Sequence, residues 1–376
     1  MNRPFHTQIM LVSDQAAANL LPALDTLLKP DKAVLLVSSK MTARADALEA
    51  VLREIAIKTV RVVLPDEHDP EALEEVMLRV GTELGSGSVT VNVTGGTKLM
   101  ALTAQAIAQM AGWSAFYIDV DTDQIIWLDK SRPAQSLTQQ LRLRHYLRGY
   151  GFHLADGIER PQPNAAWKSL VDDLIQNIGS LEDAIGQLNY LSQESQKTLS
   201  QILSPRQNTS HNLDALLRKF EQARVLTRSG EKVVFASEEA RRFANGAWIE
   251  HHVYHYVCQV TGVLGIRDKA VNLQVTDANG QNNEMDVAFL ARNRLFVIEC
   301  KTSRMDNPDD SKANDALYKL AENCRRIGGL GTRGMLASYR PLRPPEQRLA
   351  QALNIEVVTG RDLIRMEERL KNWVKP

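Results

Sequence analysis

The sequence predicts an α/β protein with a doubly wound N-terminal domain, a helical middle segment and a second α/β domain at the C-terminus. Apolar runs alternate with helical patterns up to about residue 130, and the next part is mainly helical. Consecutive antiparallel strands followed by alternating helices and strands fill the remainder. We place the domains at residues 1–150, 151–245 and 246–376.

The N-terminal domain is predicted from short runs that are almost continuously apolar, as strands buried on both faces of a parallel sheet must be. Strand–helix alternation at this spacing requires right-handed crossovers and therefore a doubly wound sheet. The short turn DTD at residues 121–123 predicts that the last two strands form an antiparallel hairpin at one edge. We expect strands at residues 7–13, 33–39, 59–65, 88–94, 114–120 and 124–129, with helices at 14–29, 41–55, 70–84 and 96–111.

The middle segment is predicted to be mostly helical between residues 165 and 245. Within it, residues 213–243 predict a helix, a turn, a short strand, a glycine turn and a second strand. This order fits a small winged-helix element, and a helical spacer with a surface hairpin fits it equally well.

The C-terminal domain begins with a predicted helix at residues 247–261. The stretch NLQVTDANGQNNEMDVAFLARNRLFVIECKT that follows has the alternation of consecutive antiparallel strands. The rest predicts a mixed sheet with helices packed on it. We expect a helix at 310–327, a strand at 333–338, a helix at 345–353, a strand at 355–359 and a final helix.

The composition excludes several classes of protein. The formal net charge is zero, which excludes a strongly basic protein that coats nucleic acid. Cys258, Cys300 and Cys324 show no CxxC spacing, which argues against a zinc or disulfide framework and fits a reducing compartment. No run approaches the roughly 18 apolar residues of a membrane helix, and the N-terminus lacks a signal-peptide core. We therefore expect a cytoplasmic protein without a membrane partner.

The turn TGGTK at residues 94–98 lies where an open α/β sheet binds ligands, beyond the carboxyl end of a strand. Gly95 and Gly96 let the backbone approach a ligand closely. Thr94, Thr97 and Lys98 place hydroxyls and a cation beside the free amides of a helix N-terminus, which favours an anion. A tight strand–helix turn capped by Thr97 is the alternative. The Walker A and GxGxxG patterns are absent, which disfavours those nucleotide sites.

Neighbouring strand ends carry further short polar side chains. Ser13 ends the first strand, with Gln15 and Asn19 just after it, and Ser38 lies at the end of the second. The carboxyl ends of parallel strands meet at one edge of the sheet, so these groups should surround the same site. Such a rim suits a ligand with phosphates and with bases or riboses.

The segment up to residue 130 resembles a CARF domain, the CRISPR-associated Rossmann-fold sensor of cyclic oligoadenylates. The stretches LVSDQAAAN and NVTGGTKLMA carry this resemblance. It implies a homodimer whose two sites join across a two-fold axis into one pocket for a symmetric ring. By match to the motif, the ligand-binding residues would be Ser13, Gln15, Asn19, Thr94, Gly95, Gly96, Thr97 and Lys98; Ser38 is added on its position alone.

A second chemical signal is the predicted hairpin at residues 283–302, with its tip at residues 291–294. This register places Asp286 opposite Glu299, with their Cβ atoms about 5 Å apart. Two carboxylates at that distance repel, and a divalent cation such as Mg²⁺ or Mn²⁺ between them would remove the repulsion. Lys301 shares a face with Glu299 and could orient water or stabilise charge on a phosphate. The alternative is a structural Glu299–Lys301 ion pair with Asp286 in solvent.

This hairpin resembles the PD-(D/E)xK nuclease motif, although Met285 stands where that motif has proline. The resemblance implies Asp286, Glu299, Lys301 and Glu250 as catalytic residues. It also adds Glu250, on the preceding helix, to Asp286 and Glu299 as metal ligands. Glu284 is assigned to the other face of its strand and left out. A zinc site on His251 and His255 is a weaker alternative, because nothing completes its ligand set.

Together the two resemblances match the CARF nucleases of type III CRISPR defence. They imply a homodimer, activated by a cyclic oligoadenylate, that cuts nucleic acid with Mn²⁺ or Mg²⁺. We favour cyclic tetra-adenylate as the activator and single-stranded DNA or RNA as the substrate. The alternative is a ligand-responsive regulator that binds nucleic acid through the winged-helix element and has no nuclease activity.

Overall fold

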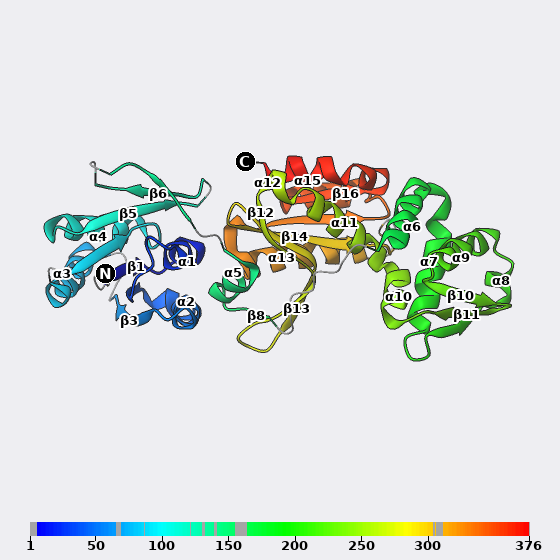
Figure 1. Cartoon of the computed structure of the whole chain (residues 1–376), viewed down its shortest axis with the longest axis horizontal. Helices are drawn as coiled ribbons and strands as arrows, with labels where there is room; N and C mark the ends of the chain where they lie inside the picture. The colour runs from blue at the N-terminus through cyan, green and yellow to red at the C-terminus, as the bar shows by residue number, and fades with distance from the viewer. Residues whose placement is uncertain are drawn as a thin grey trace.

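The computed structural model describes residues 6–64, 69–85, 87–120, 122–129, 132–138, 141–154, 164–303, 305 and 311–375. These residues form three sheets of seven, three and six strands. In Figure 1 the N-terminal sheet (blue to cyan) and the three-stranded sheet (green) lie at opposite ends, with the C-terminal sheet (yellow to orange) between them. The middle segment therefore does not separate the two α/β units in space, although it lies between them in the chain.

The N-terminal sheet has the order β3-β2-β1-β4-β5-β6-β7. Its first five strands pair in parallel, and the antiparallel partner of β5 is β6, as the short turn predicts. The short strand β7 extends the sheet by one position beyond that hairpin. The strands are β1 (His6–Leu11), β2 (Lys32–Val37), β3 (Lys58–Val63), β4 (Ser88–Asn92), β5 (Ser114–Asp119), β6 (Gln124–Trp127) and β7 (Gln135–Ser136).

Two pairs of helices cover the two faces of this sheet. Met10 and Leu35 pack under α1 and α2, whereas Ile9 and Leu11 pack under α3 and α4. Neighbouring strand residues thus bury themselves on opposite faces, which explains the continuous apolar runs in the sequence. The helices are α1 (Ala17–Leu24), α2 (Thr42–Glu54), α3 (Pro70–Leu84) and α4 (Lys98–Met110).

The middle segment has a winged-helix order of elements, with α6 (Ala165–Gln176) preceding it. A helix, a strand, two helices and a two-stranded wing follow one another, and the strands form a sheet in the order β10-β11-β9. These elements are α7 (Ile178–Glu194), β9 (Ser200–Ile202), α8 (Pro205–Asn208), α9 (His211–Gln222), β10 (Leu226–Ser229) and β11 (Lys232–Phe235). The short helix α10 (Glu238–Arg242) then leads back to the C-terminal unit.

The C-terminal sheet has the order β16-β15-β14-β13-β12-β8 and is mixed, as predicted. β13 pairs antiparallel with both β12 and β14, and β15 and β16 run parallel to β14. Its strands are β8 (His153–Leu154), β12 (Ile266–Thr276), β13 (Asn282–Ala291), β14 (Arg294–Lys301), β15 (Arg333–Ser338) and β16 (Ile355–Thr359). Its helices are α11 (Trp248–Gln259), α12 (Thr261–Leu264), α13 (Lys312–Gly328), α14 (Pro344–Ala352) and α15 (Met366–Val374).

The helix α5 (Leu143–Gly149) joins the two α/β units. Tyr146 is fully buried, and its hydroxyl donates a hydrogen bond to the carbonyl oxygen of Gly328 at 3.0 Å. The backbone N–H of Leu143 donates to Asp268 Oδ2 at 3.0 Å. One continuous apolar core therefore runs from α1 and α2 through α5 to α13. No helix among the described residues is long and apolar enough to cross a membrane.

The turn between β4 and α4 is held tightly against β1. A Cβ atom at Gly95 would lie well inside van der Waals contact with the carbonyl oxygen of Leu11, and Gly96 has a φ of +74°. Thr97 caps α4 by accepting a hydrogen bond from the N–H of Met100 at 3.2 Å. Both glycines are therefore required by the fold itself as well as by any ligand that the turn binds.

We predict that Gly95→Ala lowers the free energy of unfolding by about 1–3 kcal/mol, because the added methyl group must push β1 away from the turn. Gly87→Ala is the matched control, since its added Cβ would meet only Leu84 O at 3.6 Å. Thermal unfolding of the two variants measures the difference. Equal melting temperatures for Gly95→Ala and the wild type would contradict this account of the turn.

Candidate functional site

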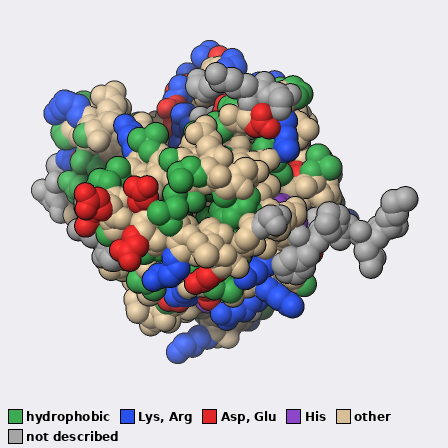
Figure 2. Space-filling model, turned by 90° about the vertical axis from the view of Figure 1, so that its left-hand side faces the viewer, with side chains coloured by type: hydrophobic (Ala, Val, Ile, Leu, Met, Phe, Trp, Pro, Cys, Tyr) green, Lys and Arg blue, Asp and Glu red, His purple; other side chains and the backbone are tan. Residues whose placement is uncertain are grey.

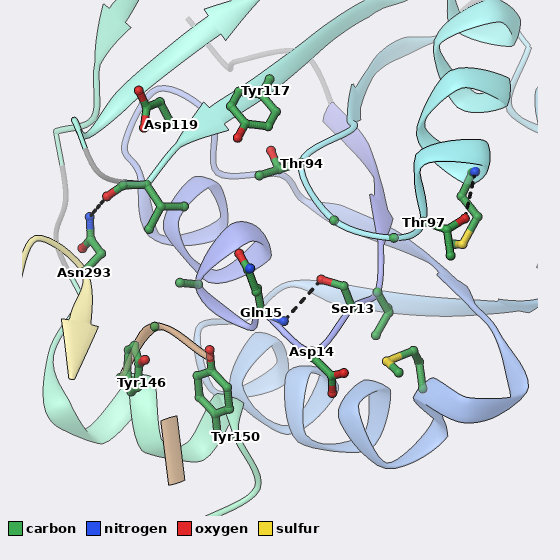
Figure 3. Close-up of a pocket in the computed structure, with 18 of the residues that line it drawn as sticks. Ser13, Asp14, Gln15, Thr94, Thr97, Tyr117, Asp119, Tyr146, Tyr150 and Asn293 are labelled. Atoms are coloured by element: carbon green, nitrogen blue, oxygen red, sulfur yellow. Dashed lines mark hydrogen bonds between the residues drawn. The ribbon is translucent and has the colours of Figure 1, made fainter. Parts of the chain in front are cut away.

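A cavity of about 600 Å³ lies at the carboxyl ends of β1, β2, β4 and β5 (Figure 3). Its opposite wall is formed by α5 and by the tip of the β13–β14 hairpin. The volume is in the range of small-molecule sites. Seven of the nine predicted ligand-binding residues line the cavity: Ser13, Gln15, Ser38, Thr94, Gly95, Gly96 and Thr97.

Thr94 has a structural role in addition to its place in the wall. Its hydroxyl donates to Asn92 Oδ1 at 2.6 Å and accepts from the N–H of Ile118 at 2.8 Å. The side chain thus connects the end of β4 to the end of β5. A ligand at this position would meet a rim whose geometry is already set by hydrogen bonds.

Asn19 and Lys98 lie outside the cavity wall, contrary to the sequence prediction. Asn19 is 1% exposed. Its amide donates to the carbonyl oxygen of Leu11 at 2.9 Å and accepts from Asn92 Nδ2 at 3.0 Å, so it supports the rim from inside the core. Lys98 begins α4 and is exposed to solvent. Neither side chain reaches the cavity of this chain.

Several lining residues were missed by the sequence analysis. Tyr117 and Asp119 come from the end of β5, Tyr146 lies on α5, and Tyr150 caps the C-terminus of that helix about one turn later. The spacing of the two tyrosines predicts one helix face, but nothing in the sequence places that face beside β1. Asn293 and Arg294, at the tip of the β13–β14 hairpin, also line the cavity (Figure 3 labels Asn293).

The second cluster lies at the other end of the same hairpin. β13 pairs with β14 from Ala291↔Arg294 to Val287↔Ile298, which is the predicted register, and its continuation places Asp286 opposite Glu299. Asp286 Oδ2 accepts a hydrogen bond from the N–H of Cys300 at 2.7 Å. Lys301 Nζ lies 2.6 Å from Glu299 Oε1.

The carboxylates of this cluster have strongly raised pKa values. Burial and the charge of Glu299 raise the pKa of Asp286 to about 7. Burial and the charges of Asp286 and Glu284 raise the pKa of Glu250 to about 8. Burial lowers the pKa of Lys301, but the negative charges of Glu299 and Asp286 outweigh this and leave it raised. The cluster therefore holds more negative charge than one lysine balances.

Glu250 and Glu299 approach Asp286 from different sides of the sheet. Glu250 lies on α11, which packs on the face that also buries Ile298 and Cys300. Glu299 alternates with those two residues and so points to the face covered by α13. Consistent with this, the pKa of Cys324 on α13 is raised by burial and by the charge of Glu299. Asp286 thus lies between the other two carboxylates.

The assignment of Glu284 to the opposite face of the strand from Asp286 was wrong. Residues two positions apart share a face in a regular strand. The strand is also irregular here, because Asn272, which faces this part of β13, has a φ of +50°. The charge of Glu284 raises the pKa of both Glu250 and Asp286, which places its exposed carboxylate near both. The alternative of a structural ion pair with Asp286 in solvent is confirmed in one part, since Glu299 and Lys301 do pair. Its other part is wrong, because Asp286 is partly buried and hydrogen bonded.

The donor set suits a hard divalent cation in charge and in atom type. Three crowded carboxylates beside one lysine carry excess negative charge that such a cation would neutralise. Among the described residues, however, no group of three or more histidine, cysteine, aspartate or glutamate side chains is arranged to hold a metal ion. That finding also leaves the zinc alternative on His251 and His255 without support, and His251 packs against Trp167 and Phe243.

The winged-helix unit contacts the strand end beside Lys301. Asn189 on α7 donates to Thr302 Oγ1 at 3.1 Å. Gly246, with a φ of +117°, lies so close to the same side chain that a Cβ atom would overlap Thr302 Oγ1. The position of α11, and with it Glu250, therefore depends on this close approach.

Two family models match separate parts of the chain. The model of the Card1 CARF domain matches residues 7–146, and the model of the Card1-like endonuclease domain matches residues 237–376. No curated protein sequence matches the chain significantly.

Solved structures share this architecture over nearly the whole chain. Protein VC1899 from Vibrio cholerae is 25% identical, with a TM-score of 0.89 over 98% of this chain and 98% of its own. Can2 from Sulfobacillus thermosulfidooxidans, solved in complex with cyclic tetra-adenylate, is 24% identical, with a TM-score of 0.81 over 99% of this chain and 100% of its own. A type III CRISPR defence DNA nuclease activated by cyclic oligoadenylate is 17% identical, with a TM-score of 0.59 over 94% of this chain and 48% of its own.

The resemblance to CARF nucleases that the two sequence motifs indicated is confirmed, as is the predicted fold class. The cavity lies largely within the part matched by the CARF model, and the carboxylate cluster lies within the part matched by the endonuclease model. The chain therefore carries an N-terminal CARF domain of the Card1 type, followed by a C-terminal Card1-like endonuclease domain.

Proposed function

We propose that the protein is a divalent-metal-dependent nuclease that a cyclic oligoadenylate switches on in type III CRISPR defence. The observation that carries this proposal is one chain that holds both an open polar cavity on the CARF sheet and a crowded carboxylate–lysine cluster on the endonuclease sheet. The free state of Cys258, Cys300 and Cys324 supports a cytoplasmic location.

The chemistry of the cavity suits a ring of nucleotides. Ser13, Ser38 and Thr97 offer hydroxyl groups, and the N-terminus of α4 offers free amides for a phosphate. Tyr117 and Tyr150 offer aromatic faces for bases. Can2, which shares the fold, was solved with cyclic tetra-adenylate, and we propose the same ring as the activator here.

A homodimer would complete the ligand site. An exposed apolar stripe runs along α4, beginning one turn after Lys98, and consists of Leu102, Ala106 and Met110. Leu102 is 68% exposed and Met110 is 73% exposed. Figure 2 shows apolar side chains among polar ones around a hollow on this end of the molecule. A second copy seated on α4 would cover these side chains and bring Lys98 toward a shared pocket.

We propose a catalytic role for each residue of the cluster. Asp286 and Glu299 would hold the metal ion, with Glu250 behind Asp286. The bound ion would lower the pKa of a water molecule and polarise the phosphate. Lys301 is 32% exposed while its partner Glu299 is 8% exposed, so the ammonium group faces the solvent side of the cluster, from which a phosphate would arrive. Its positive charge would stabilise the extra negative charge of the transition state.

The winged-helix unit gives little support to the alternative that the protein is a regulator that binds nucleic acid. On α9, Arg218 pairs with Asp214 at 2.8 Å and Lys219 pairs with Asp173 at 2.5 Å. Arg228 on the wing also pairs with Asp214. Cations held by neighbouring carboxylates contribute little to phosphate binding. We therefore propose cleavage rather than duplex recognition, and retain single-stranded DNA or RNA as the substrate.

We expect cleavage of labelled single-stranded DNA or RNA only when Mn²⁺ or Mg²⁺ and cyclic tetra-adenylate are both present. Glu299→Gln should slow cleavage by about 100-fold or more, because it removes the charge that holds the metal ion. Glu368→Gln, an exposed change on α15, is the matched control. Cutting that persists without metal, or at the wild-type rate in Glu299→Gln, would contradict the proposed centre.

Asp286→Asn should stabilise the metal-free protein. In the folded wild type the pKa of Asp286 is raised to about 7. At pH 8 this carboxyl is mostly ionised, and keeping its charge in the fold costs free energy. The neutral amide of asparagine avoids that cost. We expect a gain of about 1–3 kcal/mol and loss of the stabilisation by Mn²⁺, both measured by thermal unfolding. Asp183→Asn, at a side chain 96% exposed, should change neither. Stabilisation of Asp286→Asn by Mn²⁺ equal to that of the wild type would rule out Asp286 as a ligand.

The combined change Leu102→Glu and Met110→Glu should convert a dimer to a monomer, because it places charge on the apolar stripe of α4. Size-exclusion chromatography with light scattering measures the mass. Ile202→Glu serves as the control, since Ile202 is 66% exposed on β9 of the winged-helix unit. A monomeric wild type, or an unchanged dimer in the double variant, would show that α4 is not the interface.

A further inference from the structure

The cavity on the CARF sheet receives its positive charge from the other domain. Among the described residues that line it, Arg294 is the only lysine or arginine. Arg294 is the first residue of β14, and Gly331 of the neighbouring turn lies beside its Cγ. A guanidinium group is well suited to a phosphodiester. The cationic side chain that the described cavity wall offers to an anionic ligand therefore lies on a strand of the endonuclease sheet.

That strand also carries half of the nuclease centre. Glu299 and Lys301 lie five and seven residues after Arg294 on β14, and Asp286 lies on the paired strand β13. Five residues of strand span roughly 17 Å. Every residue of the intervening pairs, Val287 to Leu290 and Leu295 to Ile298, is at most 2% exposed. A close-packed hairpin of this kind moves as one body rather than bending between its ends.

Asn293 attaches the tip of this hairpin to the CARF domain. It is 4% exposed, and its Nδ2 donates to the carbonyl oxygen of Val120 at 3.4 Å (Figure 3) and to Asp123 Oδ1. Both partners lie in the connection between β5 and β6. Arg292 and Asn293 have φ values of +50° and +55°, as the two central residues of a tight hairpin turn require. The tip is therefore a preformed contact between the two domains.

We propose that the tip of the β13–β14 hairpin is part of the ligand sensor, with Arg294 contacting a phosphate of the bound ring and Asn293 holding the tip against the CARF sheet. This inference rests on the proposed function and adds the route of activation to it. A ligand activates only if it binds the active arrangement more tightly than the idle one. Contact with Arg294 lets the ligand favour one position of the strand that bears Glu299 and Lys301.

The test compares ligand affinity with activation in the full-length protein. Kd for cyclic tetra-adenylate is measured by calorimetry, and the stimulation ratio is the cleavage rate with the ligand divided by the rate without it. Asn293→Gly keeps the positive φ of the turn and removes only the anchoring amide. We expect Kd within about threefold of the wild type and a stimulation ratio at least tenfold lower.

Arg294→Gln should weaken ligand binding about tenfold or more and lower the stimulation ratio as well, and Arg294→Lys should restore part of both, because it keeps the charge. Asn354→Gly is the matched control: Asn354 has a φ of +55°, is exposed and lies between α14 and β16. It should match the wild type in both measurements.

The outcomes separate this inference from the proposed function. One outcome is that the ligand stimulates Asn293→Gly and Arg294→Gln as strongly as it stimulates the wild type. That result would overturn the role of the hairpin tip and leave the proposed function standing. Loss of stimulation in Asn354→Gly would also overturn it, since that site does not touch the cavity. A wild type that the ligand does not stimulate would overturn the proposed function and this inference together.

Discussion

The antiparallel pairing of β13 with β14 in one register is the constraint on which the rest of the structure depends. Because successive strand residues alternate between faces, a slip of one residue would turn every side chain of one strand to the opposite face and give it the wrong packing partners. The stacked rings of Phe289 and Phe296, 5.0 Å apart, and the fully buried pairs around them oppose such a slip. The same register brings Asp286 opposite Glu299 at one end and presents Asn293 and Arg294 to the CARF cavity at the other.

The carboxylate cluster is the least favourable part of this arrangement for stability. Burial and mutual repulsion raise the pKa values of Asp286 and Glu250 far above those of free carboxyls, so their ionised forms oppose folding at neutral pH. Strongly shifted carboxyls that share one site are typical of functional centres rather than of structural sheets. The apolar core around the hairpin compensates for this cost, which is why the cluster can exist at the end of a fully buried pair of strands.

The arrangement of the domains makes the connection between the two sites short. The winged-helix unit lies beyond the endonuclease sheet, so α5 and the hairpin tip meet the CARF domain directly (Figure 1). Tyr146 belongs to the cavity wall and also donates to Gly328 at the end of α13. A shift at the cavity therefore meets packed side chains of the endonuclease domain rather than a flexible linker. Such packed contacts favour discrete positions over gradual deformation.

The local pattern of the sequence determined both α/β units, the antiparallel hairpin, its register and the polar turn at residues 94–98, because strand alternation, helix periodicity and turn residues act over a few positions. Only the tertiary structure decided that Asn19 supports the rim from the core, that Lys98 faces solvent and that Glu284 joins the carboxylates. It also decided that Tyr146, Asn293 and Arg294 complete the cavity. The completed cavity depends on how α5 packs beside the CARF sheet and on a hairpin tip that lies more than a hundred residues from that sheet in the chain, and no local periodicity records those contacts.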